Sequence, residues 1–231
     1  GSSPMEIAFY GQDPKKAQNV YAEALEIILQ GLASGKVDFE GEFFSFKNVP
    51  LAVEPLQRPH PPIWYGVHSV ESAERAARRG LNIVSLDSAR ETRSFADRYR
   101  QVRRETQDET NALPKIGISR FVVVAGTDQE ALSAARRAYT IWHRSFYHLY
   151  RLGGTAPAHP RPAEFDAMIE RGQGIAGCPE TVCEFLEREL NESDASYLVG
   201  QFAFGDLSLA ESLRSVELFT RHVMPRLKPF P

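Results

Sequence analysis

Apolar and polar positions along the chain follow two periods, one typical of helices and one typical of buried strands. Asp13-Pro14 is a favourable helix start, because Asp caps free amides and Pro fits the first turn. Apolar residues then recur at helical spacing to about Leu32. Val37–Phe39 and Phe43–Phe46, joined by a Glu-Gly-Glu turn, predict a small hairpin.

Four units follow, each made of a short apolar strand and a helix. The predicted strands are Pro62–Gly66, Leu81–Leu86, Ile116–Ala125 and Tyr197–Phe204. The predicted helices cover residues 69–79, 92–106 and 127–149, with another near Cys178-Pro179 and a last one starting at Ser208. Ser208 and Glu211 have the spacing of a capping box. Short apolar strands that alternate with helices predict a parallel sheet with helices outside it.

The number of strands leaves two architectures open. A complete (β/α)8 barrel needs eight strands and about 250 residues, whereas only four strands of this type are visible here. An open doubly wound sheet and the second half of a barrel both fit that count. Residues 153–177 are rich in Gly, Pro and polar residues and long for a loop, which favours an insertion loop or lid.

Composition narrows the class of protein. The chain has 231 residues, 42% of them hydrophobic and 25% charged, so a packed soluble core is expected. A formal net charge of -3 argues against a nucleic-acid binder, which normally carries a basic excess. No apolar run is long enough to cross a membrane. The two cysteines, Cys178 and Cys183, form neither a disulfide framework nor a metal-ligand spacing, and we expect a cytoplasmic protein without a metal.

Gly66-Val67-His68-Ser69 is the best candidate for a site, because it lies where a strand ends and a helix begins. Gly66 permits close approach to the backbone, and helix amides with the Ser69 hydroxyl can hold a phosphate. An ordinary helix cap by Ser69 is the alternative. His68 could act as an acid-base group near neutral pH, or it could be a loop histidine.

Two further residues on the predicted strands could meet a ligand. Trp64 combines one donor with a large apolar face, so it could line a ligand pocket or fill the core. Gln201 is polar among apolar neighbours, and a buried amide needs hydrogen-bond partners. It could contact a bound ring or make a structural hydrogen bond at the end of its strand.

Several segments, taken together and in order, resemble the bacterial luciferase-like flavin-dependent monooxygenase family. They are Phe39-Glu-Gly-Glu-Phe-Phe-Ser-Phe, Gln57-Arg-Pro-His-Pro-Pro-Ile-Trp, Ala73-Glu-Arg-Ala-Ala-Arg-Arg-Gly, Gly177-Cys-Pro-Glu-Thr-Val and the stretch from Gly200 to Val223-Met-Pro. The resemblance implies a (β/α)8 TIM-barrel fold, of which this chain holds about the C-terminal half, strands five to eight. Residues 1–231 would then be a single domain that is incomplete at its N-terminal side, through truncation or as a natural fragment.

The resemblance also implies which residues bind the cofactor. It makes Gly66, Val67, His68 and Ser69 the site of the flavin phosphate, although many members have a small residue where Val67 stands. Ser2 and Ser3 fall beside the fourth-strand loop and are second candidates, with a terminus or tag scar as the alternative. Trp64 and Gln201 would lie near the flavin ring, and His68 would be the catalytic residue.

The activity implied is a monooxygenase that uses reduced FMN and O2 to oxidise a small organic substrate. A separate flavin reductase would supply the reduced FMN. One alternative is an F420-dependent oxidoreductase of the same family, and another is a non-catalytic fragment or flavin-binding relative. A half barrel has open strand edges, so we expect a homo-oligomer or pairing with the missing N-terminal half.

Overall fold

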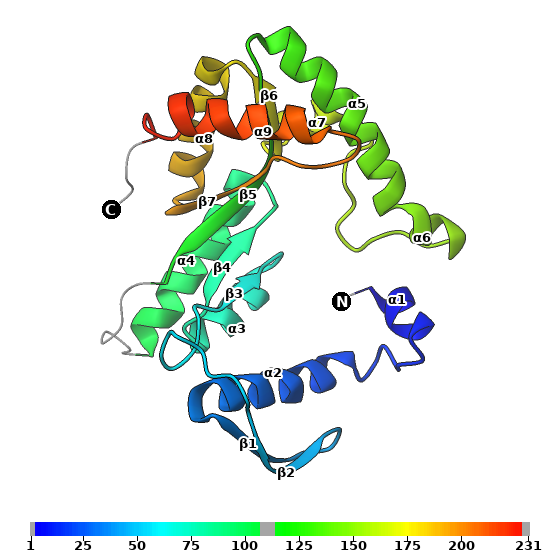
Figure 1. The fold of residues 1–231 in the computed structure, drawn as a ribbon, viewed down its shortest axis with the longest axis vertical. Helices are drawn as coiled ribbons and strands as arrows, with labels where there is room; N and C mark the ends of the chain where they lie inside the picture. The colour runs from blue at the N-terminus through cyan, green and yellow to red at the C-terminus, as the bar shows by residue number, and fades with distance from the viewer. Residues whose placement is uncertain (1–2, 107–113, 228–231) are drawn as a thin grey trace. The chain divides into compact units, whose positions relative to one another are not determined.

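The structure is a computed structural model that describes residues 3–106 and 114–227. The chain forms two compact units (Figure 1). One unit comprises Gly1–Pro62 with Tyr150–Pro157, and the other comprises Ile63–Leu149 with Ala158–Pro231. The candidate site residues at the strand ends all belong to the second unit.

The first unit contains helices α1 (Pro4–Phe9) and α2 (Ala17–Ser34) and a hairpin of β1 (Lys36–Glu40) and β2 (Ser45–Pro50). Glu23 on α2 holds the hairpin turn, since its carboxylate accepts the backbone N–H groups of Glu42, Phe43 and Phe44 at 2.8, 2.9 and 3.2 Å. The predicted helix and hairpin are therefore confirmed, with the second strand placed slightly later.

The second unit is built on a parallel sheet, as the alternation of strands and helices predicts. Its strands are β3 (Trp64–Gly66), β4 (Asn82–Ser85), β5 (Ile116–Val124), β6 (Gly174–Gly177) and β7 (Tyr197–Gln201). β5 pairs with β4 through residues 116–118, with β6 through residues 121–124 and with β7 through residues 117–121. β3 pairs with β4 alone and β7 with β5 alone among the described strands. That β3, β4, β5 and β7 are barrel strands five to eight stays a prediction.

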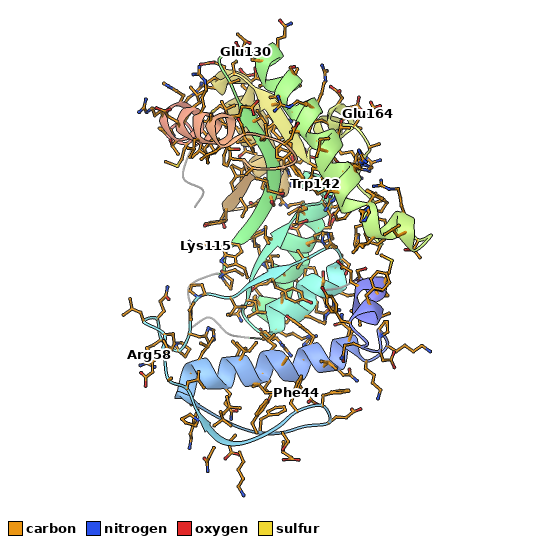
Figure 2. The ribbon with its side chains drawn as sticks, turned by 45° about the vertical axis from the view of Figure 1, so that its right-hand side comes forward. Phe44, Arg58, Lys115, Glu130, Trp142 and Glu164 are labelled. Atoms are coloured by element: carbon orange, nitrogen blue, oxygen red, sulfur yellow. The ribbon has the colours of Figure 1, made fainter. Side chains whose placement is uncertain are left out.

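Helices pack against this sheet in groups. They are α3 (Val70–Arg78), α4 (Ala89–Glu105), α5 (Asp128–Phe146), α7 (Phe165–Glu170), α8 (Pro179–Ser193) and α9 (Leu209–Leu218), followed by a π-helical turn at Phe219–Val223. The short helix α6 (His148–Leu152) follows α5 where the chain passes from the second unit to the first. α3 and α4 cover one end of the sheet and share a core with Ile83 and Ile118. α8 and the π-helical turn pack on Val122, whereas α5 and α7 pack on Phe121. Trp142 of α5, labelled in Figure 2, makes an edge contact with the Phe121 ring, with ring centroids 4.9 Å apart.

Three local features differ from the sequence reading. α7 and β6 lie inside the 153–177 stretch, and all four residues of β6 are buried. A Gly-Ile-Ala-Gly strand is too short and too rich in glycine to stand out in a sequence. α4 begins at Ala89 rather than near Thr92, because Ser88 and Glu91 form a capping box. β7 ends at Gln201, so the strand alternation expected to run on to Phe204 stops there.

Candidate functional site

His68 and Asp87 meet where two neighbouring strands end. β3 and β4 are paired in parallel with Gly66 opposite Val84, so the residues that follow them lie side by side. The Nδ1 atom of His68 is 2.9 Å from Oδ2 of Asp87. Because a carboxylate only accepts, Nδ1 of His68 carries the hydrogen of this bond. An imidazole oriented in this way can take up and release a proton at Nε2.

Asp87 is mostly buried, with its side chain 12% exposed. Burial, the largest single effect, raises the pKa of its carboxyl, and the hydrogen bond and charge of His68 lower it. Arg161 and His159 lower it further, and the net pKa of Asp87 is below its usual value. Asp87 is therefore suited to remain a carboxylate and to stabilise positive charge on His68.

The segment at residues 158–161 completes the surroundings of this pair. The ring of His159 stacks on the ring of His68, with centroids 4.5 Å apart and planes inclined by 23°. Nη1 of Arg161 donates to the carbonyl oxygen of Leu86 at 3.3 Å. The hydroxyl of Tyr147, which follows α5, accepts the backbone N–H of Arg161 at 2.9 Å. The segment is thus held against the ends of β3 and β4 by defined bonds.

The sequence pointed to His68 as a candidate but not to its three neighbours in the structure, Asp87, His159 and Arg161. A signal for Asp87 was available, because it directly follows the predicted strand Leu81–Leu86 at the edge where barrel sites form. His159 and Arg161 come from the stretch without clear periodicity. Their positions depend on tertiary contacts, so no sequence pattern pointed to them.

The start of α3 shows what the predicted phosphate site contains. The backbone N–H groups of His68 and Ser69 both donate to Oγ of Ser72, at 3.2 and 3.1 Å. The Ser69 hydroxyl accepts the N–H of Ser72 at 3.2 Å, which completes a capping box. Two amides that converge on one oxygen are the donors an anion requires. A phosphate oxygen would have to replace the Ser72 hydroxyl as their acceptor.

Gly66 and Val67 flank these donors differently. A Cβ placed on Gly66 would meet no atom within 4 Å, so space is open beside the end of the strand. The side chain of Val67 is fully buried in the core with α3, and its N–H donates to the carbonyl oxygen of Val84 at 3.0 Å. The amides of His68 and Ser69 are thus part of an ordinary helix cap, with open space beside Gly66, and Val67 anchors the turn. A phosphate at this position stays a prediction.

Trp64 and Gln201 lie on one face of the sheet, on β3 and β7. The Trp64 ring packs on the Tyr197 ring with centroids 4.7 Å apart, and both residues are the first of their strands. Nε2 of Gln201 donates to Oγ of Ser119 on β5 at 2.9 Å. Gln201 thus has the structural hydrogen bond that was one of the two readings of this residue.

The remaining predicted residues are at the start of the chain. Ser3 belongs to the first unit and caps α1, where its hydroxyl accepts the N–H of Glu6 at 3.4 Å. Ser2 lies outside the described residues. A role for either serine in binding a phosphate stays a prediction.

Residues 3–106 and 114–227 contain no cluster of three His, Cys, Asp or Glu side chains arranged to hold a metal ion. Among the described helices, none has the length and apolar character that crossing a membrane requires. Cys178 and Cys183 are free thiols.

Comparison with known proteins shows the family. The model of the luciferase-like monooxygenase family matches residues 1–198, and the chain belongs to this family. Protein y4wF of Sinorhizobium fredii is 34% identical over 98% of the chain, which spans 66% of the length of y4wF. The oxygenase component of the flavin-dependent trigonelline monooxygenase of Acinetobacter baylyi is 28% identical over 46% of the chain and 30% of its own length.

Solved structures support the fold. Monooxygenase RslO1 from Streptomyces bottropensis is similar with a TM-score of 0.81 at 21% identity, over 97% of this chain and 66% of that one. The oxygenating constituent of 3,6-diketocamphane monooxygenase from Pseudomonas putida, in complex with FMN, is similar with a TM-score of 0.67 at 20% identity. The match covers 99% of this chain and 69% of that one. The F420-dependent tetrahydromethanopterin reductase from Methanopyrus kandleri is similar with a TM-score of 0.64 at 15% identity. The match covers 94% of this chain and 65% of that one.

Proposed function

We propose that this chain belongs to a two-component monooxygenase that uses reduced FMN and O2 to oxidise a small organic substrate. The observation that carries the proposal is the His68–Asp87 pair beside the converging amides of α3, at the carboxyl ends of two parallel strands. Catalytic groups and phosphate sites of barrel enzymes occur at this edge. Membership of the luciferase-like monooxygenase family adds support from an independent direction.

The residues present suggest a division of roles. The amides of His68 and Ser69, with the open space at Gly66, would hold the FMN phosphate. Trp64 and Gln201 would present a ring and an amide to the flavin on their face of the sheet. Bound reduced FMN supplies the electrons that activate O2. His68 would exchange a proton at Nε2 while Asp87 holds its ring in orientation.

A separate flavin reductase would supply reduced FMN to this protein. The trigonelline relative carries the words oxygenase component in its name, which supports a division between two proteins. We further propose that β3, β4, β5 and β7 are strands five to eight of a (β/α)8 barrel. Their sequence order and parallel pairing agree with consecutive barrel strands.

Anaerobic titration of the chain with reduced FMN and with reduced F420 tests the proposal. Reduced FMN is expected to bind. Ser69→Ala is expected to weaken it by about tenfold, which corresponds to about 1.4 kcal/mol. Ser208→Ala is the matched control, because it removes the same kind of capping box at α9, far along the chain from the site. It should lower stability by about 1 kcal/mol and leave FMN binding unchanged.

The outcomes separate the alternatives. Binding of F420 without FMN would favour the F420-dependent oxidoreductase. If neither cofactor binds, the proposal of a flavin site in this chain is wrong, and the non-catalytic fragment is favoured. If Ser69→Ala and Ser208→Ala weaken FMN binding equally, the flavin phosphate does not bind at the start of α3.

The role of His68 has its own test. With reduced FMN bound, the rate of its reoxidation by O2 is followed against pH in the wild type, in His68→Gln and in His222→Gln. His222 is an exposed histidine of the π-helical turn and serves as the control. We expect His68→Gln to lose a pH dependence near neutrality that His222→Gln retains, because histidine changes charge in that range. Identical profiles in all three proteins would exclude a proton-transfer role in this step.

A further inference from the structure

Residues 158–162 form a strap that brings one aromatic ring onto the His68–Asp87 pair. The ring of His159 stacks on the ring of His68, with centroids 4.5 Å apart. A hydrogen bond such as the one from Nδ1 of His68 to Asp87 fixes one direction of a ring, whereas a stacked neighbour fixes its plane. The two contacts together define the orientation of the His68 imidazole.

The sequence of the strap leaves it few conformations. It reads Ala-His-Pro-Arg-Pro, so Pro160 and Pro162 each fix their own φ. Each proline also disfavours the helical region for the residue before it, and those residues are His159 and Arg161. The two side chains that reach the site therefore come from the most restricted positions of the strap. A segment restricted in this way loses little conformational entropy when it docks.

Two tyrosines hold the strap by its backbone, Tyr139 in α5 and Tyr147 just after it. The hydroxyl of Tyr139 donates to the carbonyl oxygen of Pro162 at 2.8 Å. The hydroxyl of Tyr147 accepts the N–H of Arg161 at 2.9 Å and donates to its carbonyl oxygen at 3.2 Å. The Arg161 guanidinium in turn donates to the carbonyl oxygen of Leu86. The strap is thus tied both to α5 and to the end of β4.

His159 itself contributes little to the stability of the fold. It is exposed, whereas the residues that anchor the strap at Tyr139 and Pro162 are buried. Substitution of an exposed side chain usually changes the free energy of unfolding very little. The contact that His159 makes with His68 therefore acts on the orientation of that ring rather than on the fold.

We propose that His159 is a positioning residue for His68. Its ring fixes the plane of the His68 imidazole and keeps Nδ1 directed at Asp87. Tyr147 maintains this contact through the strap. The catalytic meaning of the contact rests on the proposed proton exchange by His68, whereas the contact itself can be tested without any cofactor.

Nitrogen-15 NMR of the histidine rings, at about pH 8, provides that test. The exchange rate of the hydrogen on Nδ1 of His68 reports how firmly the ring is held against Asp87. We expect His159→Ala to speed this exchange by about threefold or more, the factor that a stacked aromatic pair contributes. His159→Phe keeps a stacking ring and should restore slow exchange. His222→Ala, at an exposed histidine of the π-helical turn, should change nothing.

A tyrosine variant tests the part played by the strap. Tyr147→Phe removes a hydroxyl that binds the strap and should speed exchange at His68 by about twofold. Tyr99→Phe is the matched control, because it removes a hydroxyl bond of 2.8 Å to the carbonyl oxygen of Leu81, in the core shared by α3 and α4. The double variant Tyr147→Phe/His159→Ala should exchange no faster than His159→Ala alone, because Tyr147 acts on His68 through His159.

A second readout connects the contact to the proposed reaction. His159→Ala should weaken the pH dependence of FMN reoxidation that we assign to His68, and His159→Phe should retain it. Urea unfolding of His159→Ala should match that of the wild type, because His159 is exposed. If NMR exchange responds as expected while reoxidation shows no pH dependence in any variant, the positioning role stands and the proposed function of His68 fails.

Three results would overturn the inference. One is exchange at His68 that is equal in the wild type and in His159→Ala. Another is equally fast exchange in His159→Phe and His159→Ala, which would mean that stacking does not hold the ring. The third is an equal effect of Tyr147→Phe and Tyr99→Phe, which would mean that the strap does not transmit the contact.

Discussion

Arg120 on β5 and Glu189 on α8 form an ion pair inside the protein, with Nη2 and Oε2 3.0 Å apart. Their side chains are 0% and 5% exposed. Burial lowers the pKa of the Arg120 guanidinium and raises the pKa of the Glu189 carboxyl, while the attraction between the two opposes both changes. Each charge depends on the other, so the pair joins the central strand of the sheet to a covering helix.

Removal of one member of this pair should be far more damaging than removal of both. Glu189→Leu leaves the Arg120 charge buried without a partner and should lower the free energy of unfolding by about 3–5 kcal/mol. The double variant Arg120→Met/Glu189→Leu should recover much of this loss, because no isolated charge remains. Urea denaturation of the wild type, both single variants and the double variant measures the coupling.

The exposed pair Arg136–Asp166 provides the control for this cycle. Its side chains are 55% and 47% exposed, and Asp166→Asn should cost less than about 1 kcal/mol. A double variant at Arg120 and Glu189 that is as unstable as the sum of its single variants would contradict the expectation.

Asp87 should contribute to stability in a pH-dependent way. Burial raises the pKa of its carboxyl, but His68 above all, with Arg161 and His159, holds the folded-state pKa below the ordinary value of 3.8. A carboxyl whose folded pKa is depressed stabilises the protein above its unfolded pKa, and this contribution is lost as pH falls through the folded pKa. Asp87→Asn should therefore cost about 1–3 kcal/mol near neutral pH and progressively less below pH 3.8.

Unfolding free energies of the wild type and Asp87→Asn between pH 7 and pH 3 provide the measurement. Asp97→Asn removes a carboxylate of an exposed pair on α4 and should cost no more than about 1 kcal/mol. If the loss of unfolding free energy in Asp87→Asn stays constant from pH 7 down to pH 3, the charge on Asp87 does not stabilise the fold.

Gly205 should not tolerate any side chain. Its φ of +60° lies in the left-handed region, and a Cβ would come within 1.8 Å of the carbonyl oxygen of Ala138 on α5. Gly205→Ala should therefore lower the free energy of unfolding by at least about 3 kcal/mol, because backbone must move to remove the clash. Gly80→Ala is the comparison, because it introduces the same left-handed backbone strain without a steric clash. Gly80 has φ +64°, and its Cβ would contact only the Arg103 side chain at 3.4 Å.

For Gly80→Ala we expect a loss of about 1–2 kcal/mol, the cost of the left-handed conformation alone. Thermal and urea unfolding of both variants give the comparison. Similar losses in the two proteins would show that the close approach of residue 205 to α5 is not maintained.

The chain should self-associate through the face of the sheet that carries Trp64, Tyr197 and Val199. These side chains are 37%, 40% and 37% exposed, and the strands β3 and β7 each have one described partner only. Exposed apolar groups beside unpaired strand edges promote association. Light scattering should show species larger than a monomer, and Val199→Lys should reduce them. Val53→Lys, at an exposed apolar residue in the first unit, should not. A compact monomer at all concentrations would contradict this expectation.

Local sequence patterns predicted most elements of the parallel sheet and its helices. The strands around Trp64, Ile83, Ile118 and Leu198 are apolar runs bounded by turn signals, so their existence can be predicted from residues that are near in sequence. The capping box of Ser208 and Glu211 was visible for the same reason, since its bonds span only three residues. β6 was not visible, because a four-residue strand that contains two glycines owes its position to β5 rather than to its own propensity.

The sequence by itself determined the family, the order of strands and helices, and the position of His68 at the end of a strand. Only the tertiary structure decided that Asp87 orients His68, that His159 stacks on it, and that Arg120 pairs with Glu189. The first set depends on periodicity and on short-range bonds, which can be read along the chain. The second depends on contacts between residues that are far apart in sequence, and these exist only once the strands have paired and the helices have packed on them.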